Sequence, residues 1–311
     1  MNNIIPQETL APSITKAASK QTYYTIRFLA DRKRMADAYC AYAYFRWVDD
    51  ILDADSVSAS ERLRFLEQQK SLLEKCYRGE VSGGGTVEEN MLIELVSHDH
   101  EGNSGLQTYL RNMMQVMDFD AKRRGKLISQ TELNQYTYWL ASAVTESMHH
   151  FIGHCDYSPR DETRYLAVTG AHITHMLRDT FDDVQAGYYN VPREVLESNH
   201  IRPQDLQSQA YRAWVRSRVQ SARQCFNAGK EYFSRVENKR CRLAGFAYTA
   251  RFEWLLDTIE KEGYSLRPEY NERKSFGKGL QMGFLTLSSL VNWRETKTYH
   301  QPFVSQSLRK L

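Results

Sequence analysis

Two pairs of aspartates have the spacing of a metal-binding helix face. Asp49 and Asp53 are four residues apart, and so are Asp179 and Asp183, so on an α-helix each pair projects from one face. Like charges at this spacing destabilise an isolated helix by roughly 0.2 to 0.5 kcal/mol per pair, and a bound cation would reverse that penalty. Carboxylate oxygens suit Mg²⁺, which also binds substrate phosphates. The two pairs therefore predict a mouth between two helices where Mg²⁺ holds a diphosphate.

Basic and aromatic residues accompany both pairs. Arg46 lies on the stripe of Asp49, Arg178 directly precedes the second pair, and Tyr42 and Phe45 come one or two turns before Asp49. The alternative interpretation is a solvated acidic face, because a single D-x-x-x-D motif often occurs by chance. Two such pairs set among apolar residues favour a pocket instead.

The elements that must position these residues are predicted to be helices. Only seven prolines and sixteen glycines interrupt the chain, and apolar residues recur at steps of three and four, the helical period. We expect about ten helices and no sheet, an all-α fold. The expected ranges are 13–29, 31–53, 59–77, 88–95, 105–124, 130–153, 161–185, 203–236, 239–262 and 274–293.

Length and composition favour one helical domain over residues 1–311, with flexible tails at 1–12 and 296–311. Apolar residues make up 41% of the 311 and charged residues 25%, which is enough to bury a sizeable interior. Basic residues exceed acidic ones by only three, without a long run of one sign, so the chain has no nucleic-acid footprint.

Several features predict a cytoplasmic protein. The five cysteines are widely spread and lack C-x-x-C spacing, and the N-terminus lacks the basic and apolar regions of a signal peptide. The apolar stretch 279–293 is shorter than the roughly 20 residues that span a bilayer. Peripheral contact with a membrane surface stays open, and so does the oligomeric state.

At these residues the sequence resembles the squalene and phytoene synthase family, the head-to-head trans-isoprenyl diphosphate synthases, as a divergent member. The ordered pair of aspartate motifs is the specific part of the resemblance, which extends over most of the chain. The matching segments are 19–24, 41–53, 117–120, 136–144, 177–183 and the region of Gly263.

The resemblance implies a class I isoprenoid (terpenoid) synthase fold, a single helical bundle with a central cavity. It implies that the two aspartate pairs bind Mg²⁺, with Mn²⁺ as a substitute, and that Arg46 helps to stabilise the departing diphosphate. Aromatic side chains would line the cavity of a carbocation, although each of them is more often simple core. The substrate-binding residues implied are Thr22, Lys20, Tyr42, Phe45, Tyr138, Ser142, Thr145, His172, His175, Arg178 and Tyr188.

The chain departs from the family pattern at several of these positions. His172 and His175 replace two amides, and they could act as neutral hydrogen-bonding substitutes, as phosphate-binding cations or as ligands of a transition metal. Ser142 and Thr145 stand at positions where the family usually has smaller residues, so their side chains would narrow a cavity. Phe252 replaces a tyrosine and so lacks a phenolic hydroxyl.

A further departure follows the second aspartate pair, where Tyr188 begins the segment Tyr-Tyr-Asn-Val-Pro in place of an arginine-containing motif. The leading expectation is an enzyme that ionises farnesyl or geranylgeranyl diphosphate and joins the cation to a second prenyl diphosphate. The closest alternative is a single-substrate terpene synthase, a cyclase or diphosphate hydrolase, which the departures favour. A non-catalytic assembly factor with the same fold is the third alternative.

Overall fold

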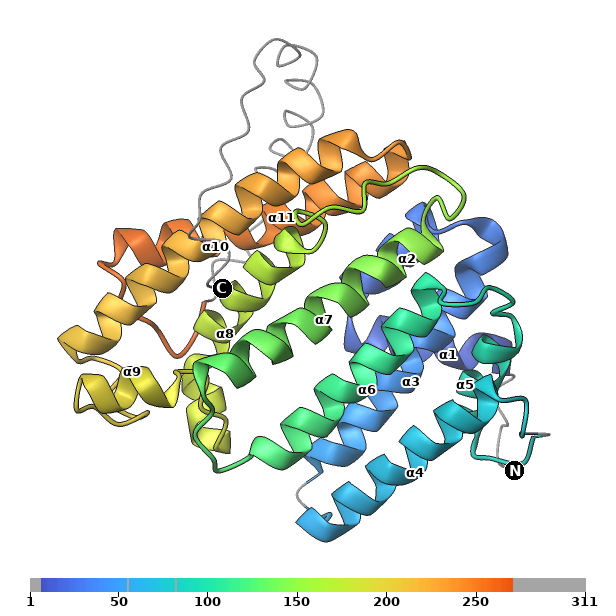
Figure 1. Cartoon of the computed structure of the whole chain (residues 1–311), viewed down its shortest axis with the longest axis horizontal. Coiled ribbons are helices and arrows are strands. Elements are labelled where there is room, and N and C mark those ends of the chain that lie inside the picture. The colour runs from blue at the N-terminus through green and yellow to red at the C-terminus, as the bar shows by residue number, and fades with distance from the viewer. Residues whose placement is uncertain (1–6, 55, 82, 271–311) are drawn as a thin grey trace. The chain divides into compact units, whose positions relative to one another are not determined.

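The computed structural model describes residues 7–54, 56–81 and 83–270, and these residues form helices joined by turns and loops (Figure 1). No strand occurs among them, so the all-α prediction is confirmed for this part of the chain. Packing divides the described residues into two units. The predicted helix 274–293 and the predicted tail 296–311 lie outside the described residues.

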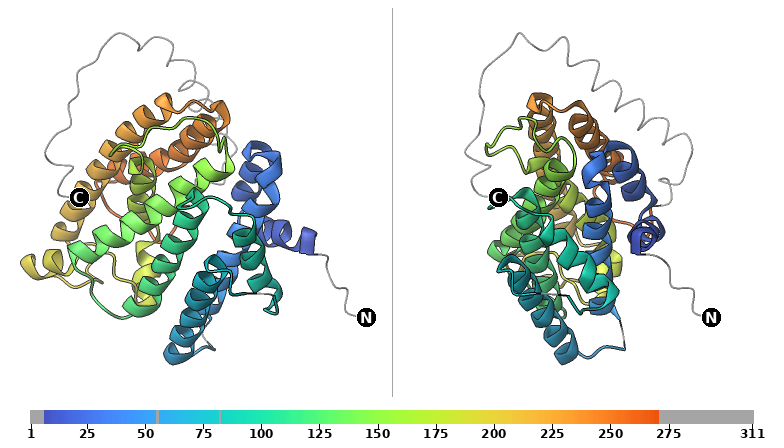
Figure 2. Two further views of the ribbon diagram at one scale, coloured as in Figure 1. Left: turned by 45° about the vertical axis from the view of Figure 1, so that its right-hand side comes forward. Right: turned by 90° about the vertical axis from the view of Figure 1, so that its right-hand side faces the viewer.

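The first unit contains the described residues up to Arg124 together with Trp139–Ser158. Within it α3 packs against α1, α5 and α6, and α4 packs against α6 (Figure 2). Its helices are α1 (Gln7–Ala18), α2 (Lys20–Leu29), the short 3₁₀-helix η1 (Arg32–Arg34), α3 (Met35–Asp53), α4 (Ala59–Tyr77), α5 (Val87–Ser97) and α6 (Gly105–Arg123).

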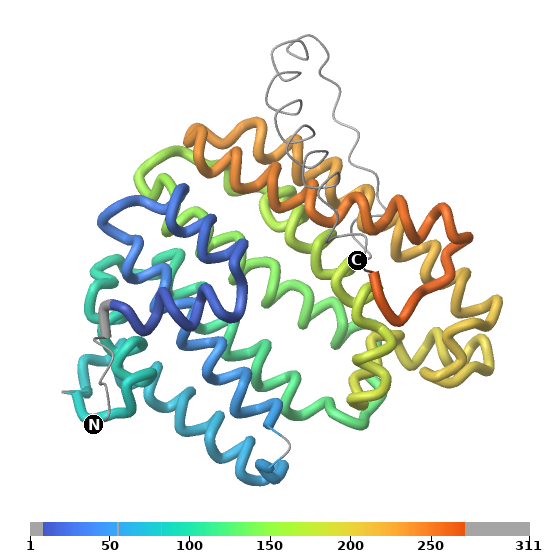
Figure 3. The backbone as a smooth tube through the Cα atoms, turned by 180° about the vertical axis from the view of Figure 1, so that it is seen from behind, coloured from blue at the N-terminus to red at the C-terminus, as the bar shows by residue number. Residues whose placement is uncertain are grey.

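The second unit contains Gly125–Tyr138 and the described residues from Pro159 onward. Three of its helices, α8, α10 and α11, pack against one another (Figure 3). The helix α7 (Gln130–Phe151) contributes residues to both units. The other helices are α8 (Leu166–Ala186), α9 (Arg193–Ser198), α10 (Gln209–Arg235) and α11 (Lys239–Lys261).

Side-chain caps explain where the helices differ from the predicted ranges. The predicted helix 13–29 is two helices, because Ser19 is extended (φ −151°) and its hydroxyl accepts a hydrogen bond from the backbone N–H of Thr22. This N-cap starts α2 and ends α1, which begins at Gln7 within the predicted tail. The prediction of a single domain with flexible tails is not tested by these observations.

Glycine and alanine bring α8 close to α10. A Cβ atom at Gly229 would lie 2.6 Å from the Cβ of Ala167, and one at Gly170 would lie 2.9 Å from the Phe226 ring. Both glycines are therefore required by a close helix crossing rather than by a turn. This crossing fixes α8, the helix that carries Asp179 and Asp183, against the core of the second unit.

None of the described helices combines the length and the apolar character needed to cross a bilayer.

Candidate functional site

The helix α3 buries one face and leaves its acidic turn at the edge of the first unit. Val48 is fully buried and Leu52 nearly so, and they form the apolar stripe that packs into the unit. Asp49 lies beside this stripe with its side chain 36% exposed, while Asp53 is exposed. The predicted pair therefore sits where an apolar core meets solvent.

Arg46 forms ion pairs with two carboxylates of this turn. Its Nη1 lies 3.0 Å from Oδ2 of Asp49, and its Nε donates to Oδ1 of Asp50 at 2.9 Å. The hydrogen bond with Asp50 raises the pKa of Arg46. Asp50 was not among the predicted site residues, yet it holds the guanidinium at the acidic turn.

A third carboxylate, Asp120 on α6, adds to the negative charge at this turn. Burial raises the pKa of Asp49 to about 6, with the charges of Asp53 and Asp120 adding to the effect and Arg46 opposing it. Burial also raises the pKa of Asp53, again with a contribution from Asp120. Asp120 accepts a hydrogen bond at 2.6 Å from Nε of the buried Arg123.

Asp120 lies in the segment 117–120 that carries part of the family resemblance, so a signal for it was present in the sequence. The neighbouring Asp118 has a different environment, because Lys70 and Lys122 lie 3.3 and 2.6 Å from its carboxylate oxygens. Of the two aspartates, Asp120 is the one whose charge contributes to the raised pKa of Asp49 and Asp53.

Two predicted substrate-binding residues lie at the start of α2. Thr22 donates its hydroxyl to the Ser19 hydroxyl at 2.9 Å and is partly buried, whereas Lys20 is exposed. Thr22 therefore belongs to the capping turn of α2 in this structure.

Three more predicted residues of the first unit are buried. Phe45 packs edge-on against Tyr109, with ring centroids 5.4 Å apart. The Ser142 hydroxyl accepts a hydrogen bond from Asn112 at 2.9 Å, and Thr145 is fully buried. Tyr42, one turn before Arg46, is partly buried.

In the second unit, α8 and the turn after it hold the other aspartate pair. Arg178 binds Asp179 through two hydrogen bonds, both of 2.6 Å, in a bidentate pair. The left-handed Gly187 (φ 86°) ends α8 and turns the chain back. This turn lets the backbone N–H of Tyr188 donate to the Asp183 carbonyl at 2.7 Å.

The same turn brings a side-chain amide to the Asp183 carboxylate. Nδ2 of Asn190 donates to Oδ2 of Asp183 at 2.7 Å, and Asn190 is buried. Asn190 was missed as a site residue, although its segment was recognised as a departure from the family pattern. It orients one of the four predicted metal ligands.

The two histidines of α8 lie among aromatic rings. His172 is buried and meets the edge of Tyr136, with ring centroids 5.1 Å apart. His175 meets Phe252 at 4.7 Å, and Phe252 in turn meets Tyr248 at 5.2 Å. The three predicted roles of the histidines stay open.

The remaining predicted residue, Tyr138, is exposed and lies edge-on to Tyr165 at 6.0 Å in the second unit. Its role in lining a carbocation cavity stays a prediction. So does the prediction that the two aspartate pairs face each other.

A metal site formed by protein side chains alone would need several ligands close together among the described residues. No group of three or more His, Cys, Asp or Glu side chains there could hold a metal ion. Asp49 and Asp53 offer carboxylate oxygens, the type of ligand that Mg²⁺ prefers. Mg²⁺ usually completes its shell with water and substrate phosphates, so these residues fit such an ion bound together with a diphosphate.

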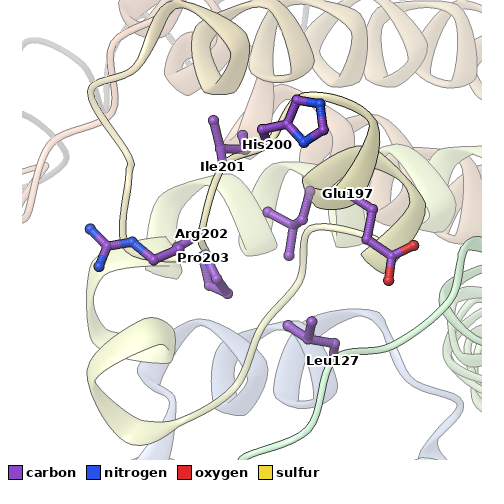
Figure 4. Close-up of a pocket in the computed structure, with 7 residues that line it drawn as sticks. Leu127, Glu197, His200, Ile201, Arg202 and Pro203 are labelled. Atoms are coloured by element: carbon purple, nitrogen blue, oxygen red, sulfur yellow. The ribbon is translucent and has the colours of Figure 1, made fainter.

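A pocket of about 470 Å³ lies elsewhere in the second unit, beside α9 (Figure 4). It contains none of the predicted site residues. It is lined by Leu127, Leu196, Glu197, His200, Ile201, Arg202 and Pro203.

The sequence model of squalene/phytoene synthases matches residues 15–277 of this chain. The chain belongs to the squalene/phytoene synthase family. A presqualene diphosphate synthase of Zymomonas mobilis is 28% identical to it over 197 residues. The matched region covers 63% of this chain and 63% of that relative's length.

Solved structures of similar proteins show the fold. The squalene synthase HpnC from Alicyclobacillus acidocaldarius is 17% identical and has a TM-score of 0.67, with 84% of this chain and 95% of that chain covered. A dehydrosqualene synthase in complex with a ligand is 21% identical, also at 0.67, with coverages of 92% and 97%. This squalene/phytoene synthase family member therefore has the expected class I terpenoid synthase fold.

Proposed function

We propose that this family member is a Mg²⁺-dependent prenyltransferase that ionises an allylic prenyl diphosphate, farnesyl or geranylgeranyl, and joins the cation head to head to a second prenyl diphosphate. The observation that carries the proposal is the match to the squalene/phytoene synthase family over residues 15–277. The metal requirement is supported by the acidic turn of α3, where burial and neighbouring carboxylates raise the pKa of Asp49 to about 6. Such a turn favours a bound divalent cation, because the cation offsets charge that the protein leaves uncompensated.

Bound Mg²⁺, or Mn²⁺ in its place, would neutralise the charge that develops on the diphosphate as it leaves. The chain's own residues prepare that event. Asp49 and Asp53 would hold cations from α3, and Asp179 and Asp183 from α8. Arg46 stays at the acidic turn through Asp50 and Asp49, from which its guanidinium could reach a diphosphate oxygen.

The experiment compares diphosphate release from farnesyl and geranylgeranyl diphosphate with and without Mg²⁺. We expect release only with the metal, and loss of release in Asp179→Asn. Helical content measured by circular dichroism should stay unchanged, because the charge serves the ion rather than the core. Release that is equally fast in EDTA would contradict the metal assignment, and no release under any metal would favour the assembly-factor alternative.

The relative from Zymomonas mobilis suggests the product class. Presqualene diphosphate, by its name, keeps a diphosphate group. Two substrates would then yield one condensed diphosphate, one free diphosphate and one proton, and no reductant would be needed for this step. We expect one diphosphate released for every two prenyl diphosphates consumed, which a phosphate-coupled assay and mass spectrometry of the extract can measure together.

A single-substrate terpene synthase is the second candidate. It is favoured by the buried Ser142 and Thr145, which stand where the family has smaller residues, and by His175 packed against Phe252. This candidate predicts a product with one substrate's carbon skeleton and one diphosphate released per substrate. We expect His175→Asn to alter the product distribution more than the overall rate if this position governs product choice.

The apolar or amphiphilic product of either reaction would leave the protein for a lipid phase. We therefore propose that the protein acts in the cytoplasm and makes peripheral contact with a membrane.

A further inference from the structure

The helix α2 exposes two aromatic rings on one face. Phe28 is 70% exposed and Tyr24 is 48% exposed, and their rings are stacked with centroids 6.0 Å apart and planes 9° apart. They are four residues apart and so share a stripe of the helix, while Ile26 on the opposite side is buried. Large stacked rings turned toward solvent are unusual in a helix that already buries another face.

Three exposed basic residues lie close to these rings in the sequence. Arg27 on the same stripe of α2 and Arg32 and Lys33 of η1 are all exposed. Among the described residues none of the three has an ion-pair partner. We call Tyr24, Arg27, Phe28, Arg32 and Lys33 the α2 surface.

Acidic residues are nearly absent from this part of the chain. Between positions 16 and 34 the sequence has six basic residues and a single acidic one, Asp31. The Asp31 carboxylate accepts hydrogen bonds from the backbone N–H groups of Gly153 at 3.0 Å and His154 at 3.2 Å. It is therefore held by the backbone, and the α2 surface keeps its positive charge.

We propose that the α2 surface docks the protein on a membrane that contains anionic lipids. Aromatic rings lie favourably at the boundary between lipid headgroups and acyl chains, with an apolar body and, for tyrosine, a polar tip. Lys and Arg near the membrane are attracted by the negative surface potential of anionic lipids. Stable peripheral binding takes two such signals, and the α2 surface combines them.

The chemistry of the surface favours lipid over nucleic acid. A nucleic-acid footprint usually covers a larger basic area, whereas the whole chain has a formal net charge of only +3. Here the charges are few, and the same short stretch of chain carries Phe28, the most exposed aromatic residue among the described residues. The proposal that the α2 surface binds a membrane depends only on residues of the first unit. Its purpose, the transfer of an apolar product to the bilayer, rests on the proposed function.

The test is co-sedimentation of the full chain with vesicles of phosphatidylcholine alone or mixed equally with phosphatidylglycerol. We expect binding to the mixed vesicles, weaker binding as salt rises above the physiological range, and little binding to phosphatidylcholine alone. The triple variant Phe28→Ser, Arg32→Gln, Lys33→Gln should lose binding by a hundredfold or more, at about fivefold per charge and about tenfold for the ring.

A matched control comes from α4, which exposes Leu63, Arg64 and Lys75. The variant Leu63→Ser, Arg64→Gln, Lys75→Gln removes the same kinds of side chain and should bind the mixed vesicles like the wild type. Equal losses of vesicle binding in both triple variants would show that binding depends on net charge alone, and would overturn the proposal. So would a wild type that does not sediment with the mixed vesicles, or one that binds single-stranded RNA at this surface instead.

Enzyme activity distinguishes this proposal from the proposed function. Diphosphate release in detergent solution should be the same in the α2 triple variant and the wild type, because none of its three residues belongs to the predicted site. Vesicle binding without any diphosphate release would leave the docking surface standing and refute the proposed activity.

Discussion

At the scale of single residues, burial makes the ionised form of Asp49 less favourable in the folded chain than in the unfolded chain. Its pKa is about 6 in the folded chain against 3.8 for the free group, so the folded state binds more protons than the unfolded state between these values. Stability without metal should therefore fall as pH rises from about 4 to about 6. Because the side chain is about a third exposed, solvent screening limits the effect to about 1 kcal/mol.

This pH dependence can be tested in EDTA by thermal unfolding of the wild type and Asp49→Asn. We expect the variant to be the more stable of the two at pH 7 and to approach the wild type near pH 4, where the aspartate is protonated. The difference should reverse in sign when Mg²⁺ and inorganic diphosphate are added at pH 7. A variant that is less stable than the wild type in EDTA at pH 7 would contradict the burial argument.

Asn190 makes a second prediction at this scale, because it orients a carboxylate without being an expected ligand. Asn190→Ala removes the 2.7 Å hydrogen bond to Asp183 and should weaken Mg²⁺ activation roughly 10- to 100-fold. The readout is the Mg²⁺ concentration at half-maximal diphosphate release. The matched control is Asn199→Ala on the exposed end of α9, which should leave that concentration unchanged.

At the scale of helices, the crossing of α8 and α10 determines how firmly the second aspartate pair is held. A methyl group at Gly229 would lie within 2.7 Å of the backbone of Ala167, so Gly229→Ala must push the helices apart. We expect a loss of about 1 to 3 kcal/mol in the free energy of unfolding, measured with urea. Gly102→Ala meets no atom within 4 Å and should change it by much less.

Most helices could be predicted from sequence, because local periodicity decides their existence. The ends of α4 were predicted as observed, at Ala59 and Tyr77. The start of α8 was not, because Asp161 accepts hydrogen bonds from the Thr163 N–H and from Arg235, and this turn delays the helix to Leu166. Arg235 is distant in sequence, so no local pattern reports the contact.

The candidate site likewise has residues that could be predicted from the sequence and residues that could not. Asp49, Asp53 and Arg46 could be found because they share one helix, and helical spacing is visible in the sequence. The influence of Asp120 depends on the packing of α6 near α3, and that of Asn190 on the turn at Gly187. Such contacts follow from tertiary structure, so the sequence alone offered only a family resemblance as their signal.

At the scale of the whole molecule, the proposed function requires both aspartate pairs to act on one ligand. A ligand present at about 100 times its Kd stabilises a protein by about 2.7 kcal/mol. We expect Mg²⁺ with inorganic diphosphate to raise the Tm of the wild type, and each of Asp53→Asn and Asp183→Asn to abolish most of that rise. If only one variant loses it, the two pairs bind separate ligands, and the predicted mouth between two helices is wrong.

The path of the chain through the two units has a consequence for biosynthesis. Residues 125–138 belong to the second unit, yet the chain returns to the first for 139–158 before it enters the second again. A ribosome must therefore release the chain as far as residue 158, including residues 125–138 of the second unit, before the first unit has all its parts. Neither unit can be obtained whole by cutting the gene once, and a nascent chain halted near residue 124 would expose surface that α7 normally covers.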